Sequence, residues 1–232
     1  PAIAADAMLL SALRAHKAEL LSALQAGGLP PVAAVPTATA GPREPYQQRW
    51  AKLPLVALDC ETYYDKHYNL EKRTVLEYTF DPAFKLHGIA VRYPDGTTEF
   101  RTDAVALIAE LRAEYGEQLE GAAVVFHNGY FDYFVLHHRF GLRLGNIVDT
   151  LLLSRLLHGP DVPARLGDLA ERYGLPPKGH IGFMEGVRNP TADQLAQLRI
   201  YGATDAQITG RLAEILLPLA FSKTPIELWA ID

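Results

Sequence analysis

The chain has 232 residues, of which 49% are hydrophobic and 21% are charged, and its formal net charge is −5. This composition is typical of a folded protein with one sizeable core and excludes an intrinsically disordered chain. The single cysteine, Cys60, excludes a disulfide framework and argues against a thiolate zinc site. The acidic charge is only weak evidence against nucleic-acid binding, because a protein that binds divalent cations must itself cluster carboxylates.

The first 49 residues divide into two segments. Residues 1–26 carry leucines at helical spacing among charged residues, which predicts an amphipathic helix and not a signal peptide. Residues 27–49 are rich in Pro, Ala and Gly over most of their length, which predicts a linker. No apolar run reaches transmembrane length, so we expect no membrane contact and a cytoplasmic location.

The pattern changes near residue 50. The segment LPLVALDCET predicts a buried strand that ends in acids, and residues 86–93 and 96–101 predict a hairpin around the turn formers Pro94, Asp95 and Gly96. Residues 103–115 predict a helix with an inward face formed by Val105, Leu107, Ile108 and Leu111.

The second half of the chain alternates strands with helices. Buried strands are predicted at 122–126 and 146–150, and the helix after the first of them is expected to end at Gly141. Further helices are predicted at 165–173 and from Thr191, as N-cap, to about Leu217. We therefore predict an α/β fold, with a mixed central sheet flanked by helices on both faces.

Three acids are expected to meet at one edge of this sheet. Asp59 and Glu61 are two apart at the end of a strand, so their side chains point to the same side. Asp132 follows the next buried strand, and sites in such sheets form outside the carboxyl ends of the strands. Taken singly, each acid has an ordinary alternative, either a solvated strand end or a helix first-turn acid that favours the macrodipole.

A fourth acid lies in the last predicted helix. Tyr201 and Asp205 are four residues apart and so share a helix face, in surroundings of small and apolar residues. A carboxylate buried there is costly unless it is paired or bound to a metal. Four clustered carboxylates with no thiolate favour Mg²⁺ or Mn²⁺, and two such ions suit in-line displacement at a phosphodiester.

These residues carry a family resemblance. Asp59-x-Glu61, Asn128-x-x-x-Asp132 and Tyr201-x-x-x-Asp205 resemble, in order, the three motifs of DEDD 3′→5′ exonucleases, and the tyrosine resembles the DEDDy branch. The surrounding segments FHNGYFDYFVL and VDTLLLSRLL resemble the proofreading exonuclease of phage family A DNA polymerases. The resemblance covers residues 50–218 as a ribonuclease H-like exonuclease domain, and residues 219–232 resemble the start of a connection to a polymerase domain.

The resemblance also implies roles for individual residues. Asp59, Glu61 and Asp205 would ligate a first metal ion, Asp59 would bridge to a second, and Asp132 would hold the second largely through water. Tyr201 would orient the attacking water. In the family, the residues at the positions of Thr62 and Asn128 lie beside the 3′-terminal nucleotide. The implied partners are the single-stranded 3′ end of DNA and a polymerase domain in the same or an associated chain, in a bacterial host cell if a phage encodes it.

Other residues near the motifs have two interpretations. Tyr63 and Phe131 would stack on bases of the strand or simply pack in the core, and Lys178 and Arg188 would contact phosphates or remain in a solvated loop. Asp149 is expected to be a helix N-cap.

Three alternative functions stay open. One is a ribonuclease D-like 3′→5′ exoribonuclease, because the residues do not show tolerance of a 2′-hydroxyl. Another is a catalytically silent DNA-binding domain. In a third, the N-terminal helix docks a replication partner through its leucines.

Overall fold

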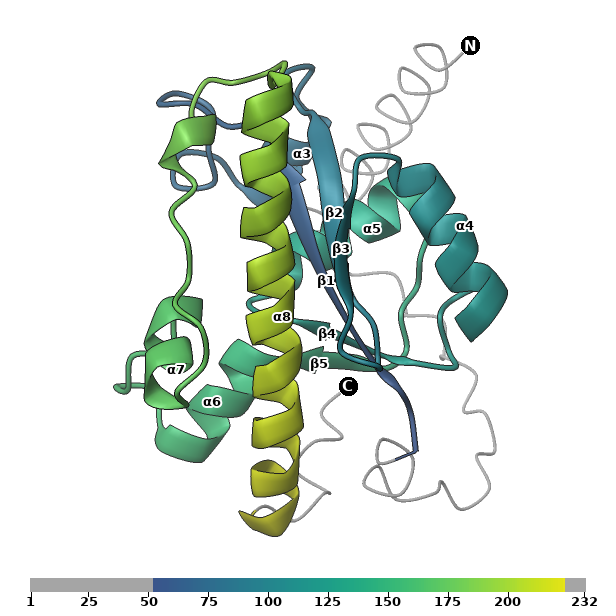
Figure 1. The fold of residues 1–232 in the computed structure, drawn as a ribbon, viewed down its shortest axis with the longest axis vertical. Coiled ribbons are helices and arrows are strands. Elements are labelled where there is room, and N and C mark those ends of the chain that lie inside the picture. The colour runs from purple at the N-terminus through teal and green to yellow at the C-terminus, as the bar shows by residue number, and fades with distance from the viewer. Residues whose placement is uncertain (1–51, 224–232) are drawn as a thin grey trace, which may run out of the picture. The chain divides into compact units, whose positions relative to one another are not determined.

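The computed structural model describes residues 52–223 (Figure 1). The predicted helix over residues 1–26 and the predicted linker over 27–49 lie outside these residues, as does most of the predicted connecting segment 219–232. The strands are β1 (Leu55–Thr62), β2 (Leu86–Arg92), β3 (Thr98–Arg101), β4 (Ala123–Phe126) and β5 (Ile147–Asp149). The helices are α3 (Val75–Phe80), α4 (Ala104–Tyr115), α5 (Tyr130–Phe140), α6 (Thr150–His158), α7 (Leu166–Arg172), the 3₁₀ turn η1 (Gly182–Met184) and α8 (Ala192–Lys223).

The five strands form one mixed sheet in the order β3-β2-β1-β4-β5. β1 pairs antiparallel with β2, and β2 with β3, so the predicted hairpin around Gly96 is confirmed. β1 pairs parallel with β4, and β4 with β5. β1 is therefore the central strand, and the parallel strands β1, β4 and β5 end at the same edge of the sheet.

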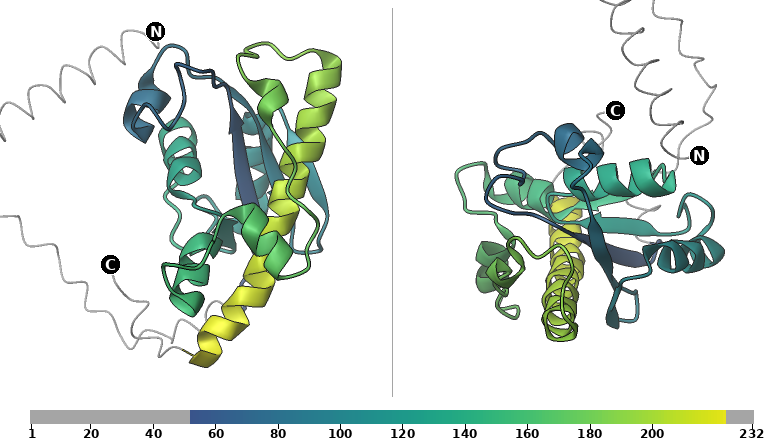
Figure 2. Two further views of the ribbon diagram at one scale, coloured as in Figure 1. Left: turned by 90° about the vertical axis from the view of Figure 1, so that its left-hand side faces the viewer. Right: turned by 90° about the horizontal axis from the view of Figure 1, so that it is seen from above.

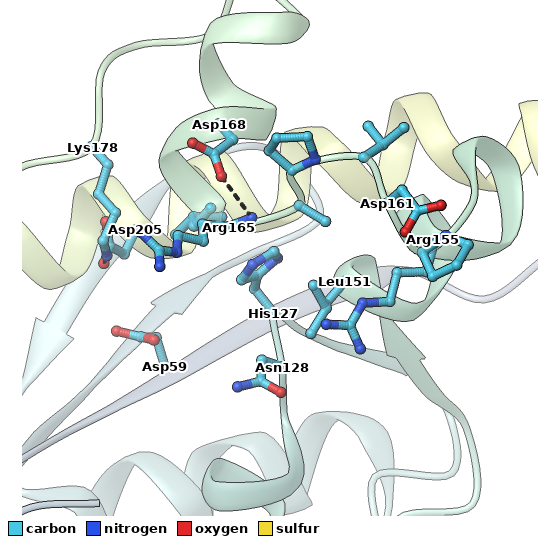
Figure 3. Close-up of a pocket in the computed structure, with 15 residues that line it drawn as sticks. Asp59, His127, Asn128, Leu151, Arg155, Asp161, Arg165, Asp168, Lys178 and Asp205 are labelled. Atoms are coloured by element: carbon cyan, nitrogen blue, oxygen red, sulfur yellow. Dashed lines mark hydrogen bonds and ion pairs between the residues drawn. The ribbon is translucent and has the colours of Figure 1, made fainter. Parts of the chain in front are cut away.

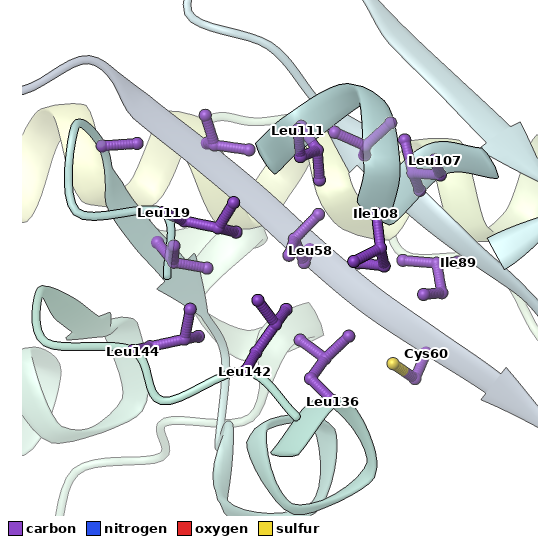
Figure 4. Packing of buried hydrophobic residues seen from close by; sticks show 14 of the residues in the cluster. Leu58, Cys60, Ile89, Leu107, Ile108, Leu111, Leu119, Leu136, Leu142 and Leu144 are labelled. Atoms are coloured by element: carbon purple, nitrogen blue, oxygen red, sulfur yellow. The ribbon is translucent and has the colours of Figure 1, made fainter. Parts of the chain in front are cut away.

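Side-chain alternation along β1 divides the core between the two faces of the sheet. Val56, Leu58 and Cys60 face the first hydrophobic cluster, which includes residues of α4 and α5 (Figure 4). Ala57 faces a second cluster formed with α6, α7 and α8. The views in Figure 2 show α8 on one side of the strands and α5 on the other. Helices on both faces are thus confirmed, and Cys60 is a small core residue as expected.

Most predicted helix boundaries agree with the structure. Gly141 ends α5 in the left-handed conformation with φ 68°. At the start of α8 the Thr191 hydroxyl accepts a hydrogen bond from the Gln194 backbone N–H at 3.2 Å, and the Gln194 side chain accepts one from the Thr191 N–H at 3.0 Å. This reciprocal pair satisfies two backbone donors that a helix start leaves without partners.

Two details of the predicted helices are wrong. The inward face of α4 is formed by Ala104, Leu107, Ile108 and Leu111, whereas Val105 is 71% exposed because it is one position out of register with that face. Helix α8 also continues past Leu217 to Lys223, with Pro218 inside it. Burial of the neighbouring apolar side chains in the second cluster outweighs the hydrogen bond that proline removes. No helix in residues 52–223 is long and apolar enough to cross a membrane.

Candidate active site

Strand β1 holds the first two acids at its carboxyl end. Asp59 and Glu61 pair with Ala90 and Gly88 of β2, so the backbone that carries them is fixed by the ladder. Asp59 is partly buried and Glu61 is 6% exposed. Each of the two carboxyl groups affects the pKa of the other, so they do lie on one side of the strand as their spacing predicts.

The third acid is brought to β1 by the first turn of α5. The Oδ1 atom of Asp132 accepts a hydrogen bond from the Cys60 backbone N–H at 2.8 Å, between the two acids of β1. The entry to α5 is fixed by Asp149, whose carboxylate accepts the backbone N–H groups of Asn128 at 3.1 Å and Gly129 at 2.9 Å. The same carboxylate caps α6, so the prediction that Asp149 is an N-cap is confirmed.

Helix α8 brings the fourth acid against the sheet. Gly202 and Ala206 face the strands, and a Cβ at Gly202 would lie 3.0 Å from Phe100 and 3.2 Å from Ala90. These small residues allow a close helix–sheet approach. Asp205 on the same helix is 2% exposed, and its Oδ1 atom is buried without a hydrogen-bond partner among the described residues.

A lysine from the loop before α8 also enters the acid cluster. The ammonium group of Lys178 forms an ion pair with the Oδ2 atom of Asp205 and donates a hydrogen bond to the Tyr201 hydroxyl at 2.7 Å. It also lies 4.8 Å from the centre of the Tyr201 ring. Figure 3 shows the Lys178 side chain reaching Asp205 from its loop, with Asp59 on the opposite side.

Burial and like charge together favour the protonated forms of the acids. Burial, and then the charge of Asp205, raise the pKa of Asp59 to about 6. Burial, and then the charge of Asp59, raise the pKa of Asp132 to about 8 and hold that of Glu61 well above its usual range. Burial is also the main cause of a raised pKa at Tyr201, whose hydroxyl is therefore protonated at neutral pH.

A pocket of about 900 Å³ opens from Asp59 and Asp205 toward α6 and α7 (Figure 3). His127 and Asn128 form part of its wall, and burial lowers the pKa of His127 to about 4, so this imidazole is neutral. Two guanidinium groups, of Arg155 and Arg165, also line the pocket. Sequence reasoning missed both, because an isolated arginine in a helix or at its start is usually solvated, and only the tertiary fold places it in the wall of this pocket.

Several residues predicted to contact substrate do not line this pocket. The Thr62 hydroxyl is 2.9 Å from that of Tyr78, and the Phe131 ring packs edge-on against Tyr78 with centroids 5.7 Å apart. Tyr63 donates to Asp65 at 2.6 Å, and Arg188 binds the carbonyl oxygen of Ala83 at 2.7 Å. Of that predicted set, Asn128 and Lys178 are the residues in the pocket wall.

The possible ligand atoms at this site are of the chemical type that a hard divalent cation prefers. They are carboxylate oxygens, and the buried Oδ1 of Asp205 is an acceptor that lacks a partner among the described residues. Within residues 52–223, however, no three acidic, histidine or cysteine side chains are grouped closely enough to hold one metal ion. The positive charge in contact with Asp205 is instead the ammonium of Lys178.

Comparison with known proteins agrees with the geometry. Residues 44–220 match the family model DNA_pol_A_exo1, described as 3'-5' exonuclease. No curated protein matches the chain in sequence.

Solved structures with a similar fold were also found. They include NrnC of Brucella melitensis bound to pGG, at 17% identity and TM-score 0.53, covering 78% of this chain and 80% of that one. The catalytic core of RRP6 from Trypanosoma brucei matches at 16% identity and TM-score 0.51, covering 76% of this chain and 44% of that one. RNase D of Trypanosoma brucei matches at 11% identity and TM-score 0.52, covering 74% and 60%. At these identities the likeness shows the fold alone, and it confirms the ribonuclease H-like α/β class.

Proposed function

The chain belongs to the 3′-5′ exonuclease family whose model it matches, and from this membership we propose that it removes nucleoside monophosphates from the 3′ end of a DNA strand. One observation carries the proposal. Four carboxylates and a tyrosine, from β1, α5 and α8, lie near enough to interact by charge, two of the acids, Asp59 and Asp205, line an open pocket, and one buried oxygen of Asp205 lacks a partner among the described residues. A carboxylate cluster of this kind suits metal-dependent phosphodiester hydrolysis.

The proposed metal ligands are the four acids. Asp59, Glu61 and Asp205 would hold a first divalent cation, and Asp59 and Asp132 a second, the latter largely through water. Two such ions, Mg²⁺ or Mn²⁺, would supply the charge that activates water and stabilises the leaving 3′ oxygen. Because burial raises the pKa values of Asp59 and Asp132, ion binding must displace protons from these carboxyl groups, and affinity for the ions should increase with pH.

Tyr201 is proposed to orient the attacking water together with Glu61. Its raised pKa keeps the hydroxyl protonated, so Tyr201 acts as a hydrogen-bonding group and not as a general base. Gly179 lies close to one side of the ring, where an added Cβ would be 3.1 Å from the Tyr201 Cδ2.

The pocket is proposed to receive the terminal nucleotides. The guanidinium groups of Arg155 and Arg165 line the same pocket as Asp59 and give its wall positive charge. Guanidinium groups commonly bind the phosphates of a nucleic-acid backbone. Asn128 is proposed to lie beside the terminal nucleotide. Substrate contacts from Thr62, Tyr63, Phe131 and Arg188 remain predictions for the part of the strand outside the pocket.

We further propose that the biological role is proofreading during DNA replication, beside a polymerase domain in the same or an associated chain. The name of the matching family model and the quoted sequence resemblance support this role. An RNA strand is the second candidate substrate, since the solved structures of similar fold include an RNase D.

The test uses a 5′-labelled primer with a recessed 3′ end, and an RNA strand of the same sequence, each incubated with the protein and Mn²⁺. We expect the DNA to shorten stepwise from its 3′ end. Chelator, Asp59→Ala and Asp205→Ala should each stop the reaction, with circular dichroism confirming that the variants fold. Degradation of RNA that is faster than that of DNA would show that RNA is the preferred substrate. Strand binding without cleavage by folded wild-type protein would instead indicate a silent binding domain.

A further inference from the structure

Lys178 occupies an unusual place for a loop lysine. Its ammonium contacts the carboxylate of Asp205, whose side chain is only 3% exposed, while the Lys178 side chain itself remains 33% exposed. The same ammonium donates to the Tyr201 hydroxyl at 2.7 Å and lies over the Tyr201 ring. One cation thus contacts the two α8 residues that the proposed mechanism needs for the metal and for the water.

The ion pair between Lys178 and Asp205 also has an electrostatic effect on the neighbouring acids. Among the described residues, the cationic side chain of Lys178 lowers the pKa values of Asp59 and Glu61, against the raising effects of burial and of neighbouring carboxylates. A buried carboxylate without a compensating charge is strongly unfavourable. Lys178 therefore supplies compensation to acids that would otherwise repel one another.

A divalent cation would have to compete with the Lys178 ammonium for the carboxylate of Asp205. An ammonium on Asp205 Oδ2 and a divalent cation on the same carboxylate would repel each other, since like charges at such distances are strongly unfavourable in a partly buried site. The exposed stem allows the ammonium to leave toward solvent or toward a phosphate of the strand.

We propose that Lys178 is an internal counter-cation, which neutralises the acid cluster in the metal-free protein and has to leave Asp205 before a divalent cation binds. This inference rests on the proposed function, because it assumes that Asp205 is a metal ligand. Lys178 thereby stabilises the metal-free fold and weakens metal binding. It is a positioning residue in the metal-free state.

The first experiment measures Mn²⁺ binding to the full chain by calorimetry, without nucleic acid. Lys178→Met should bind Mn²⁺ about tenfold or more tightly than wild type, since a charge-assisted contact no longer competes. Its melting temperature in chelator should be lower. The matched control is Lys66→Met, which removes the same charge from an exposed lysine of the loop after β1, and it should behave like wild type.

A second experiment needs no variant and so does not depend on the folding of Lys178→Met. Reductive methylation of wild type, mapped by mass spectrometry, should leave Lys178 protected in chelator and label it in saturating Mg²⁺, while Lys66 is labelled equally in both. Equal labelling of Lys178 in the two conditions would overturn the inference, as would equal or weaker Mn²⁺ binding by Lys178→Met. Failure of both proteins to bind Mn²⁺ would overturn the two-metal part of the proposed function as well.

Discussion

The Oδ1 atom of Asp132 accepts a hydrogen bond from the backbone N–H of Cys60 at 2.8 Å. The two residues are 72 positions apart in the chain, and Cys60 lies between the two acids of β1. One oxygen of the α5 acid is therefore used to tie that helix to the strand that carries Asp59 and Glu61. The proposed function assigns the other oxygen to a metal ion, so Asp132 would combine a structural role with a chemical one.

These two roles can be separated by substitution. Asp132→Asn keeps an oxygen that can accept from Cys60, so we expect a fold close to wild type in stability, with exonuclease activity lowered at least about 100-fold, as for loss of a catalytic group. Asp132→Ala should lose activity equally and also lose about 1–3 kcal/mol of stability, because the buried Cys60 N–H loses its partner. Denaturant unfolding and a primer-shortening assay measure the two effects. Equal stability of the two variants would show that the hydrogen bond contributes nothing.

Stability of the metal-free protein should decrease as pH rises. The pKa of Asp132 is raised to about 8 in the folded state, so between its ordinary value and 8 the folded protein binds more protons than the unfolded chain. Stabilisation by the protonated acid is therefore complete at low pH and is lost as pH rises toward 8. His127, with its pKa lowered to about 4, has the opposite effect, but only below its ordinary value of about 6.5.

The window from about pH 6.5 to about pH 8 thus excludes the opposing effect of His127 and reports mainly on Asp132. We expect the melting temperature in chelator to fall across it by at least about 2–4 °C, the shift for 1 kcal/mol in a protein of this size. The melting temperature of Asp132→Asn should decrease less over the same range, and saturating Mg²⁺ should remove most of the decrease in wild type. A melting temperature that rises with pH in chelator would contradict the assignment.

Arg155 should act on substrate binding and not on the chemical step. Arg155→Ala removes a pocket cation that lies apart from the acid cluster, so we expect KM to rise several-fold with kcat nearly unchanged. The salt dependence of strand binding should also weaken, by the amount expected for the loss of about one phosphate contact. Arg143→Ala is the control, since Arg143 is exposed and does not line the pocket. A fall in kcat alone would place Arg155 in the reaction itself.

Gly129 is required by close packing at the start of α5. An added Cβ would overlap the Cβ of Phe126 and lie 2.6 Å from its Cγ, atoms that cannot move without the strand. We expect Gly129→Ala to cost about 1–3 kcal/mol, as overpacking usually does. Gly145→Ala provides a matched control, because a Cβ there meets nothing within 4 Å. Thermal unfolding of the two variants compares them, and equal melting temperatures would show that α5 can shift freely.

Local patterns were enough to predict most of the elements and the acid set. Side-chain alternation along residues 55–62 placed Asp59 and Glu61 on one side of a strand, and the four-residue spacing placed Tyr201 and Asp205 on one helix face. The prediction for Val105 failed because a hydrophobic residue one position off the buried face was counted with it. The last helix, predicted to end at about Leu217, continues to Lys223 because packing carries it past Pro218.

What the sequence by itself determined is the fold class, because strand and helix periodicity is local, and it predicted the four acids and their tyrosine from their spacing and from the family resemblance. Only the tertiary structure decided which distant groups contact these acids or line the pocket next to them. The ammonium of Lys178 on Asp205, the Asp132–Cys60 hydrogen bond and the two guanidiniums of the pocket join segments far apart in the chain. Such contacts depend on how helices and loops dock on the sheet, and no local periodicity encodes that docking.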